Sequence, residues 1–383
     1  MRKILTLTLL SVLLVSLSGC AGQAKDEELN DNELVAEEPA VKDNTDNQTK
    51  DQSEDEDLET EEEKEVDSEE VETILNYYPF VKNRLMKYEG KGNEYAEMET
   101  MVEYMEEDLV QIKTTNAGTN VVNVLEYKDG TLKQVFGEGE FYHIENMLDA
   151  SRNMDNILLK EPIEVGNSWE DAEGNKVEIT SLEHDLDLPY GKYKALEVTT
   201  SYENNAVKKD YYIKDIGYAG NIYIDGDLEV ETSLKDIEDQ GIQIPVKVYY
   251  PLIDETASKY ISKNIDFKTN DDTKIILEKL LKNPDSDKVM PAIPENANIN
   301  KINLNRDNWN LEVDLSEGFI EDMNAGSSYE IEIVNSIVNT LGSFYDIERV
   351  YLTVGGKPYA SGHLELLEDE YFEVYTEGIE QLE

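Results

Sequence analysis

A short run of alternating side chains near the end of the chain constrains the fold more than any other feature. The apolar members are Trp309, Leu311, Val313 and Leu315, and the polar members between them are Asn310, Glu312, Asp314 and Ser316. A period of two predicts a β-strand with one buried side and one side facing solvent. Ile302 and Leu304 predict a preceding strand, joined to this one by a turn at Asp307 and Asn308.

A helix is predicted directly after this strand pair. Apolar residues recur at spacings of three and four, which puts them on one side of a helix. They are Ile331, Val334, Ile337, Val338 and Leu341. Ser327 or Ser328 is the expected N-cap of this helix, and Gly342 is its expected stop.

Three motifs in this region follow one another in order. They are Val313-Asp314-Leu315-Ser316 with Phe319 three residues on, the run 333–341, and the alternating strand 350–354 that ends at Gly355-Gly356. Together they resemble the GerM (GerMN) domain, a family that occurs in sporulation and spore-germination proteins of Gram-positive, clostridial-type bacteria.

Upstream landmarks extend the resemblance to residues 243–376. Residues 246–251 resemble the opening strand of the family, and residues 280–284 resemble the end of its first helix. Asn283 stands where the family has glycine, which is a mild departure because asparagine also adopts a left-handed backbone. Asp271 or Asp272 is the expected cap of that helix. Its expected inward side chains are Ile275, Ile276 and Leu280, with Leu277 as a further candidate.

The expected fold of this C-terminal domain is α+β. The order strand, extended piece at 261–267, helix, hairpin, helix, strand is close to a β-α-β-β-α-β plan, with two helices on one face of a mixed sheet. The resemblance implies a compact module like the ring-building motifs of sporulation secretion channels, which associate side by side. Residues 371–375 are an expected edge strand, and the glutamate-rich residues after them are expected to fray.

Residues 73–236 predict a second, β-rich domain. Hairpin turns recur at Asp129-Gly130, Glu173-Gly174-Asn175 and Asp225-Gly226. Strands are expected at 121–127, 177–182, 195–202, 208–213 and 220–224, and a short helix at 144–149. The expected result is a mostly antiparallel, strongly curved sheet. A spacer role and a ligand-binding role both stay open. The aromatic candidates for a ligand site are Tyr77, Tyr78, Trp169, Tyr211 and Tyr212.

Residues 1–20 predict a lipoprotein signal peptide. Arg2 and Lys3 precede a short apolar core that ends at Leu17-Ser18-Gly19-Cys20. This run is too short to span a bilayer, and its end resembles the bacterial lipobox. The resemblance implies that Cys20, the single cysteine of the chain, receives a diacylglycerol and further acyl chains such as palmitate. Several acyl chains anchor a protein firmly, so the expected location is the extracytoplasmic face of the cell membrane.

The chain is strongly acidic, with a net charge of −51 over 383 residues. Residues 21–72 hold 23 acidic against 4 basic side chains and few apolar ones, so they are expected to form a disordered linker. More than half of the net charge therefore belongs to the rest of the chain. Such a surface repels phosphate backbones, and no nucleic-acid partner is expected. A salty habitat and a basic partner both explain this acidity.

The sequence predicts an interaction protein, not an enzyme. It has no nucleophile elbow, no phosphate-binding glycine loop and no His-Glu-x-x-His motif, and no cofactor or metal site is expected. His143, His184 and His363 lie apart and are expected at the surface or in loops. The resulting hypothesis is a membrane-anchored envelope lipoprotein that acts as an interaction and assembly module in sporulation or spore germination. The alternative is an extracytoplasmic lipoprotein that binds a ligand or a cell-wall glycan.

The expected partners follow from this hypothesis. They are membrane lipid through acylated Cys20, proteins of the envelope or of a sporulation complex, and a second copy of the GerMN-like domain. The contact is expected on the helix face opposite the core or on an exposed sheet edge.

Overall fold

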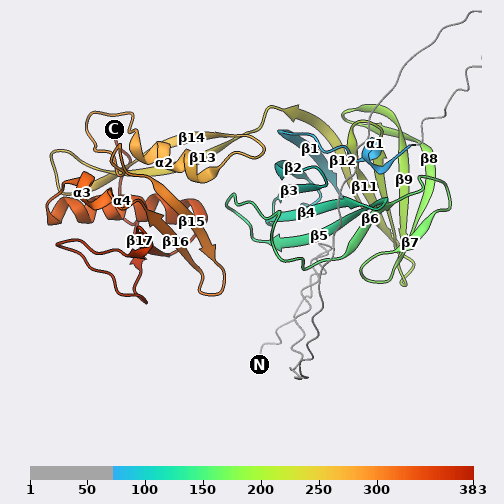
Figure 1. Ribbon diagram of the computed structural model, residues 1–383. Helices are drawn as coiled ribbons and strands as arrows, with labels where there is room; N and C mark the ends of the chain where they lie inside the picture. Colours follow the sequence, from blue (N-terminus) through green and yellow to red (C-terminus); the bar gives the residue numbers. More distant parts are fainter. Residues whose placement is uncertain (1–71) are drawn as a thin grey trace, which may run out of the picture. The chain divides into compact units, whose positions relative to one another are not determined.

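The computed structural model describes residues 72–383, which form one compact unit (Figure 1). The predicted signal peptide, the lipidation site at Cys20 and nearly all of the acidic linker lie outside the described residues. None of the helices within residues 72–383 combines the length and the apolar character needed to cross a membrane.

The first half of the described chain forms one twelve-stranded sheet, preceded by the short helix α1 (Ile74–Tyr77). Its strands are β1 (Arg84–Lys91), β2 (Met98–Met105), β3 (Leu109–Asn116), β4 (Asn120–Lys128), β5 (Thr131–Gly139), β6 (Asn156–Lys160), β7 (Ser168–Glu170), β8 (Lys176–Leu188), β9 (Gly191–Ser201), β10 (Val207–Ile213), β11 (Gly217–Asp225) and β12 (Leu228–Asp239). All the strand pairs are antiparallel, in the order β6-β5-β4-β3-β2-β1-β12-β11-β10-β9-β8-β7.

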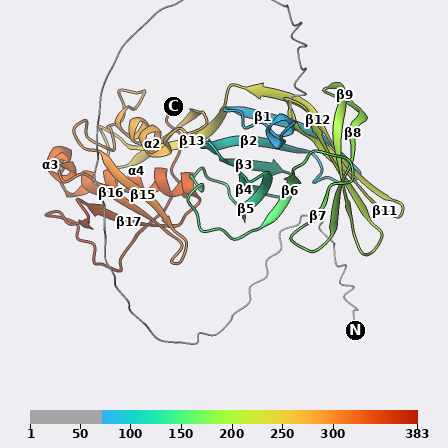
Figure 2. The same cartoon turned by 45° about the vertical axis from the view of Figure 1, so that its right-hand side comes forward.

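The sheet curves until its two end strands meet, as both views show (Figures 1 and 2). The indole N–H of Trp169 on β7 donates to the carbonyl of Ile157 on β6, at 3.1 Å. Apolar side chains from both ends of the sheet and from α1 fill the interior, among them Ile74, Leu132 and Leu196. The prediction of a mostly antiparallel, strongly curved sheet is therefore confirmed. The hairpin turn at Asp129-Gly130 is confirmed as well, since both residues have a positive φ.

The predicted helix at 144–149 is wrong. The β3 side chain Gln111 holds this segment in an irregular conformation, because its amide donates to the carbonyl of Glu145 (2.9 Å) and accepts from the amide of Met147 (2.7 Å). These bonds satisfy backbone groups that a helix would pair internally. Ile144 and Leu148 are buried, so the segment still covers part of the core.

The second half of the described chain is a mixture of helices and strands. Its elements are β13 (Ile242–Pro251), β14 (Ser258–Phe267), α2 (Thr273–Lys282), β15 (Ile299–Asn305), β16 (Asn310–Leu315), α3 (Phe319–Met323), α4 (Ser327–Tyr345), β17 (Arg349–Val354), β18 (Lys357–Pro358) and β19 (Phe372–Glu373). β16 and β17 are parallel and the other pairs are antiparallel, so the five-stranded sheet is mixed and the α+β class is consistent with it.

The β-α-β-β-α-β plan is not confirmed. The opening strand β13 pairs with β14 in a two-stranded sheet and has no ladder with β15, β16 or β17. Helix α4 separates them, since it contacts both β13 and β17. The extended piece at 261–267 lies within β14, and the edge strand expected at 371–375 is present as β19, which pairs with β17.

Helix α4 differs from its prediction because other parts of the chain pack against it on several sides. Ile331 is 43% exposed, whereas Ser336, Asn339 and Thr340 are buried, so the side chains do not divide into one apolar face and one polar face. The N-cap is Gly326, and neither predicted serine caps the helix. The helix also passes its predicted stop at Gly342 and ends at Tyr345, with Asp346 in the left-handed conformation (φ 54°).

Some further expectations for the C-terminal half are wrong. Trp309 lies in the hairpin turn with φ 49° and is 53% exposed, and Asn310, expected to face solvent, is buried, so the predicted alternation holds only from Leu311. Ile275 is exposed, whereas Ile276 and Leu280 pack partly buried against the core as expected. Leu277, the further candidate, is buried together with Leu281. Asn283 ends α2 with a negative φ of −124°, so no left-handed residue is needed there, while the predicted cap Asp272 is confirmed.

The residues after β19 do not fray. The carbonyl of Glu380 accepts from the amide of Tyr260 at 3.1 Å, and the amide of Leu382 donates back to the carbonyl of Tyr260 at 2.8 Å. Two main-chain hydrogen bonds to β14 therefore hold the glutamate-rich end of the chain in place.

Candidate functional site

The aspartate of the first motif holds a turn together. Asp314 lies at the end of β16, and its carboxylate accepts from the hydroxyl of Thr353 (2.6 Å), the amide of Gly356 (2.7 Å) and the amide group of Asn300 (2.8 Å). Partial burial opposes ionisation, yet the hydrogen bonds from Thr353, Asn300 and Gly356 hold the pKa of Asp314 below its usual range. Every one of these contacts is internal, so the motif positions strands β15 to β17 and offers no free reactive group.

The polar residues in the second motif are also structural. Thr340 accepts from the amide of Tyr249 on β13 through its hydroxyl oxygen, at 2.9 Å. Asn339 accepts from the amide of Tyr375, just after β19, at 2.8 Å. Both side chains are buried, and each satisfies a backbone donor that has no ladder partner on that side. Helix α4 thus binds the β13 hairpin on one side and the segment after β19 on another.

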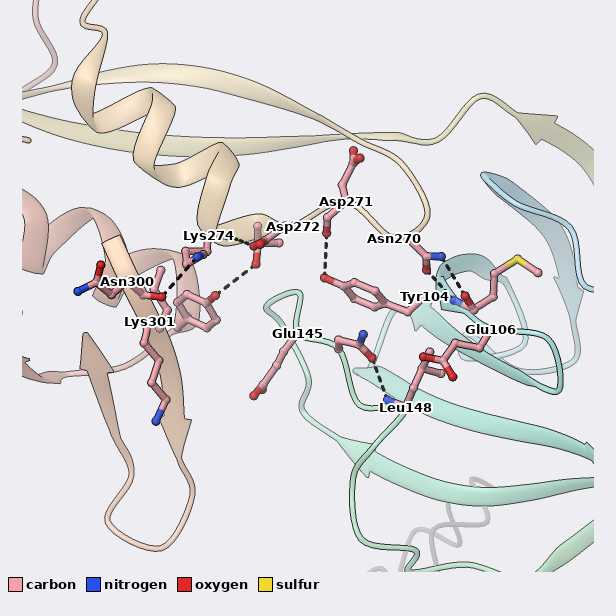
Figure 3. Close-up of a pocket in the computed structure, with 15 residues that line it drawn as sticks. Tyr104, Glu106, Glu145, Leu148, Asn270, Asp271, Asp272, Lys274, Asn300 and Lys301 are labelled. Carbon is pink, nitrogen blue, oxygen red and sulfur yellow. Dashed lines mark hydrogen bonds between the residues drawn. The ribbon is translucent and has the colours of Figure 1, made fainter. Parts of the chain in front are cut away.

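A pocket of about 550 Å³ lies between the twelve-stranded sheet and the elements α2 and β15 (Figure 3). Acidic and basic side chains both line it, namely Glu106, Glu145, Asp271, Asp272, Lys274 and Lys301. The two aspartates are already engaged, because Asp272 accepts from the amide of Lys274 (2.9 Å) and Asp271 from the amide of Lys268 (2.8 Å). Both aspartates therefore stabilise the backbone at the start of α2.

The rim of this pocket is fixed by a β-bulge in β2. The ladder between β2 and β3 shifts register at Glu103, which frees backbone groups of β2. Asn270 binds them with three hydrogen bonds: its amide to the carbonyl of Glu103 (3.0 Å), and its side chain to the amide (2.8 Å) and carbonyl (2.9 Å) of Met105. The hydroxyl of Thr269 donates to the carbonyl of Val102 at 2.6 Å. The segment before α2 is thus docked on the sheet.

Beneath the rim lies a buried charged group. The Glu103 side chain is fully buried and pairs with the ammonium of Lys113 at 2.7 Å, and the side-chain amide of Gln111 donates to it at 2.9 Å. Lys113 also donates to the carbonyl of His143. Burial raises the pKa of Glu103, and the charge of Lys113 opposes that rise. These contacts attach the loop at 141–150 to the sheet, which is a structural role.

Arg306 joins the β15–β16 hairpin to the same loop. Its guanidinium pairs with Glu145 at 2.8 Å and with Glu138 at 3.2 Å. The other partner of Glu145 is the imidazole of His143, at 3.2 Å. Burial opposes ionisation of Glu145, but hydrogen bonds from His143 and Arg306 hold its pKa below the usual range. His143 lies in a loop, which agrees with the prediction of a surface or loop histidine, but its side chain is buried.

The aromatic residues proposed for a ligand site in the β-rich part do not form one. Tyr77, Trp169, Tyr211 and Tyr212 are buried, and Tyr78 packs among them at 6.2 Å from the ring of Tyr212. Burial raises the pKa of Tyr78 and Tyr212. They belong to the core of the curved sheet and are not available to a ligand in this structure.

A group of exposed and half-buried aromatic and basic side chains lies at one end of the five-stranded sheet, and we call it the Arg349 cluster (Trp309, Arg349, Tyr351 and Tyr371). Arg349 lies over the ring of Tyr371, 5.4 Å from its centroid, and donates to the carbonyl of Asn308 at 2.8 Å. Tyr371 packs edge-on against Tyr351 with centroids 5.9 Å apart. Trp309 follows Asn308 in the chain and is half exposed, in contrast to the buried Trp169.

Arg349 differs from the other arginines of residues 72–383. Arg84, Arg152 and Arg306 each pair with a carboxylate, whereas Arg349 forms no ion pair within this range. In so acidic a chain, an exposed guanidinium held by an aromatic ring and a carbonyl keeps donors available to a partner. The sequence did not predict this cluster, because the alternation placed Trp309 in a strand and the other members lie far from it in the chain.

No group of three or more acidic, histidine or cysteine side chains that would suit a metal ion occurs within residues 72–383. His184 pairs with Glu197 at 3.2 Å and stacks on Tyr211, and His363 lies exposed in a turn. Cys20 is not among the described residues, so its lipidation stays a prediction.

Comparison with known proteins identifies one domain. Residues 247–360 match the model of the Germane family, which is described as sporulation and spore germination. This agrees with the GerM-like resemblance of the sequence motifs. No curated protein sequence matches the chain.

Several solved structures resemble parts of the chain. The tandem GerMN domains of the sporulation protein GerM from Bacillus subtilis are 19% identical over 34% of this chain and 46% of that one, with a TM-score of 0.27. This chain therefore spans about half the length of that tandem structure. An exported protein with a YmcC-like fold from Bacteroides fragilis is 10% identical over 42% of this chain and 98% of that one, with a TM-score of 0.27. A lipoprotein from Parabacteroides distasonis is 13% identical over 42% and 98%, with a TM-score of 0.25.

Proposed function

Because residues 247–360 form a Germane domain, we propose that this chain is a non-enzymatic envelope lipoprotein that works as an interaction module in sporulation or spore germination. Acylated Cys20 anchors it at the extracytoplasmic face of the membrane, and residues 21–72 act as the linker. The sheet and the Germane domain are presented together to a protein of the envelope or of a sporulation complex.

The observation that carries this proposal is the Arg349 cluster. Tryptophan, tyrosine and arginine dominate the residues that contribute most to protein–protein binding. The two aromatic residues bury a large area with little loss of side-chain entropy, and arginine offers a planar group with several donors. Trp309 and Arg349 lie within the Germane match and Tyr371 lies just after it. All three are exposed or only partly buried, and Arg349 has donors without an acidic partner in the described chain.

The contacts around the motifs support a role without catalysis. Asp314, Thr340 and Asn339 are all engaged in internal hydrogen bonds. The carboxylate with a raised pKa near the pocket, Glu103, is enclosed by Lys113 and Gln111. A general acid needs access to substrate, and Glu103 is fully buried.

The packing of α4 narrows the choice of contact surface. The helix face opposite the core was one expected contact, but residues 336–342 of α4 are all buried. That half of the helix has no face left for a partner, so sheet surfaces and strand edges are the better candidates.

Spore counts test the proposal. A strain that lacks the protein is complemented with the full chain, with a Trp309→Ala, Arg349→Ala double variant, or with Arg152→Ala as the matched control for loss of one surface arginine. We expect heat-resistant spores, or germination of those spores, to fall without the protein and to recover with the full chain and the control only. Immunoblots of the membrane fraction confirm equal amounts. Unchanged spore yield and unchanged germination in the deletion strain would remove the proposed function.

A further inference from the structure

The hairpin β13–β14 has a regular alternation of inward and outward backbone groups. The amide of Tyr249 on β13 donates to Thr340, and both backbone groups of Tyr260 on β14 bond to the segment at 380–382. In an antiparallel ladder, the residues between these positions bond across the pair. The odd-numbered residues of β13 and the even-numbered residues of β14 therefore direct their N–H and C=O groups away from the hairpin.

The distal halves of both edges already receive other extended segments. On β13, the carbonyl of Pro251 accepts from the amide of Met290 at 2.8 Å, and Leu252 forms a bridge with Val289. On β14, Tyr260 forms a parallel bridge with Gln381. The edges of this hairpin are thus suited to an added strand, as two segments of the chain itself demonstrate.

The proximal half of the β13 edge has no such segment. Gln243, Pro245 and Lys247 are its outward residues, and all three are exposed. Across residues 72–383, no hydrogen bond reaches their outward amides or carbonyls. Pro245 has no N–H, so this edge offers two donors, at Gln243 and Lys247, and three acceptors.

A hollow of about 380 Å³ lies beside this edge. Its lining mixes apolar side chains, among them Ile244, Val246 and Phe344, with polar ones, namely His143, Lys247, Ser343 and Thr376. Ile244 and Val246 are the β13 residues between the outward ones. In an added strand, the residues opposite them point to the same side of the sheet, which is the side where Ile244 and Val246 line the hollow.

Lys247 is the one lysine or arginine that the described residues contribute to the lining of the hollow, and acidic groups lie around it. Helix α4 ends there with its carbonyls and the partial negative charge of a helix C-terminus. Tyr142 donates to the carboxylate of Glu140. The pKa of Tyr142 is raised, first by that hydrogen bond and also by the charge of Asp346. Lys247 lies over the ring of Tyr260, 4.9 Å from its centroid.

We propose that the β13 edge at 243–247 binds an extended segment of a partner protein as an added β-strand. The segment places apolar side chains opposite Ile244 and Val246, and it carries lysine or arginine on either side of them. Main-chain hydrogen bonds give the affinity, and the hollow selects the apolar residues. This inference rests on the proposed function, because it names one contact by which the interaction module takes up a partner.

Charge argues for a basic partner over a second copy of this chain. A pairing of two identical β13 edges brings together two strongly acidic molecules, and the net charge of −51 opposes it. The same charge attracts a basic segment and strengthens its binding, and salt weakens that binding because it screens the attraction.

The test uses the full-length chain in detergent and a fluorescein-labelled peptide. The peptide has two valines at alternate central positions, threonines around them and lysines at both ends. We expect saturable binding by fluorescence anisotropy. Lys247→Pro removes an outward N–H without touching the ladder, so it should weaken binding about tenfold. Ser262→Pro removes an outward N–H from the open part of the β14 edge and should leave binding within about twofold.

Two further variants distinguish the contribution of the strand edge to peptide binding from the contributions of the Lys247 charge and of the hollow. Lys247→Ala removes the ammonium group and keeps the N–H, so binding should stay within about twofold of the unchanged chain. Ser343→Trp keeps every N–H and C=O group of the edge and fills the hollow from an exposed position. It should weaken peptide binding by about tenfold or more. This variant tests the proposal even if Lys247→Pro fails to fold. A peptide with glutamates in place of the lysines should bind more weakly.

Three results would overturn the proposal. They are no saturable binding up to about 1 mM peptide, equal weakening by Lys247→Pro and Ser262→Pro, or dimerisation of the chain that Lys247→Pro alone abolishes, which would assign the edge to a second copy. These failures are distinct from failure of the proposed function. A chain that binds no peptide but restores heat-resistant spores keeps the function and loses only this contact.

Discussion

Single residues in α4 have functions that their types alone do not reveal. A glycine inside a helix normally weakens it by about 0.5–1 kcal/mol relative to alanine. Gly342 lies inside α4, and a Cβ there would meet a methyl group of Val374 at 2.2 Å and the carbonyl of Ile347 at 2.9 Å. The glycine is therefore required for the close approach of the chain after β19, and not as a helix stop.

Gly342→Ala should consequently destabilise the protein, against the usual direction of this substitution. The expected loss in the free energy of unfolding is about 1–3 kcal/mol, the typical cost of overpacking. Ser343→Ala, at the next and exposed position of the same helix, is the control and should be neutral or slightly stabilising. Urea unfolding measures both. A gain in stability for Gly342→Ala would contradict the packing described.

Lys113→Met tests the buried pair with Glu103. Loss of the cation leaves a fully buried carboxylate without its charge partner, which should cost about 3–5 kcal/mol near neutral pH. The pKa of Glu103 is already raised by burial, and without Lys113 it should rise further. The folded state then holds a proton that the unfolded state releases, so stability falls as pH rises from about 4.5 through the folded pKa.

The loss in the free energy of unfolding that Lys113→Met causes should therefore be smaller at pH 5 than at pH 8, as measured by urea unfolding at both pH values. Adding Glu103→Gln removes the ionisable group and should abolish the extra pH dependence. An equal deficit at both pH values would show that lost packing, and not the charge, explains the effect.

At the scale of elements, α4 connects structures that share no ladder. Its polar residues meet the edge of β13 and the segment after β19, while its apolar residues pack on the five-stranded sheet. Thr340→Val keeps the shape of the side chain and removes the acceptor of the Tyr249 amide. An unpaired buried N–H costs about 1–3 kcal/mol, so this loss is expected in the free energy of unfolding.

Amide hydrogen exchange provides the local measurement for this variant. The Tyr249 amide should exchange faster in Thr340→Val, whereas Thr340→Ser keeps the hydroxyl and should preserve its protection. Equal exchange in the two variants would mean that the hydrogen bond to α4 does not protect this edge of β13.

The sequence predicted elements well wherever a local period decides them. The strands around Val313 and Leu352, the curved antiparallel sheet and the hairpin turn at Asp129 all follow from alternation and turn chemistry. Pairing between distant strands leaves no local period, so the separation of β13 from the five-stranded sheet was not predicted. The exposure of Trp309 depends on its positive φ in the turn, which the alternation concealed.

The candidate site was less predictable than the fold. The Arg349 cluster combines side chains from β17, from the β15–β16 turn and from the segment before β19. Residues so far apart in the chain show no common spacing. A contact at an exposed strand edge was predicted from the sequence. Its proposed location on β13 was not, because the sequence does not show which strand edges are already paired with other segments of the chain.

At the scale of the whole molecule, one hydrophobic cluster extends from Val122 and Val124 on β4 to Val338 on α4. The three hydrogen bonds of Asn270 lie at the same junction. Asn270→Ala should therefore loosen the docking of the segment before α2, at a cost of about 1–3 kcal/mol. Faster exchange of the Met105 amide would show it. Asn264→Ala, exposed on β14, is the control. Unchanged exchange at Met105 would contradict this role of Asn270.

The strand order of the large sheet has a consequence for how it assembles. Every ladder but one joins strands that are consecutive in the chain, and the exception, β1 with β12, joins Arg84 to Asp239. Two meanders can thus form rapidly from local hairpins, and the closing step between them is the slow one. Until it occurs, β1 and β12 are open edges on which chains can aggregate. The charged residues along both strands disfavour pairing with another chain during that interval. Once the sheet closes, ion pairs between the two strands, such as Lys87 with Glu238, form in the native register.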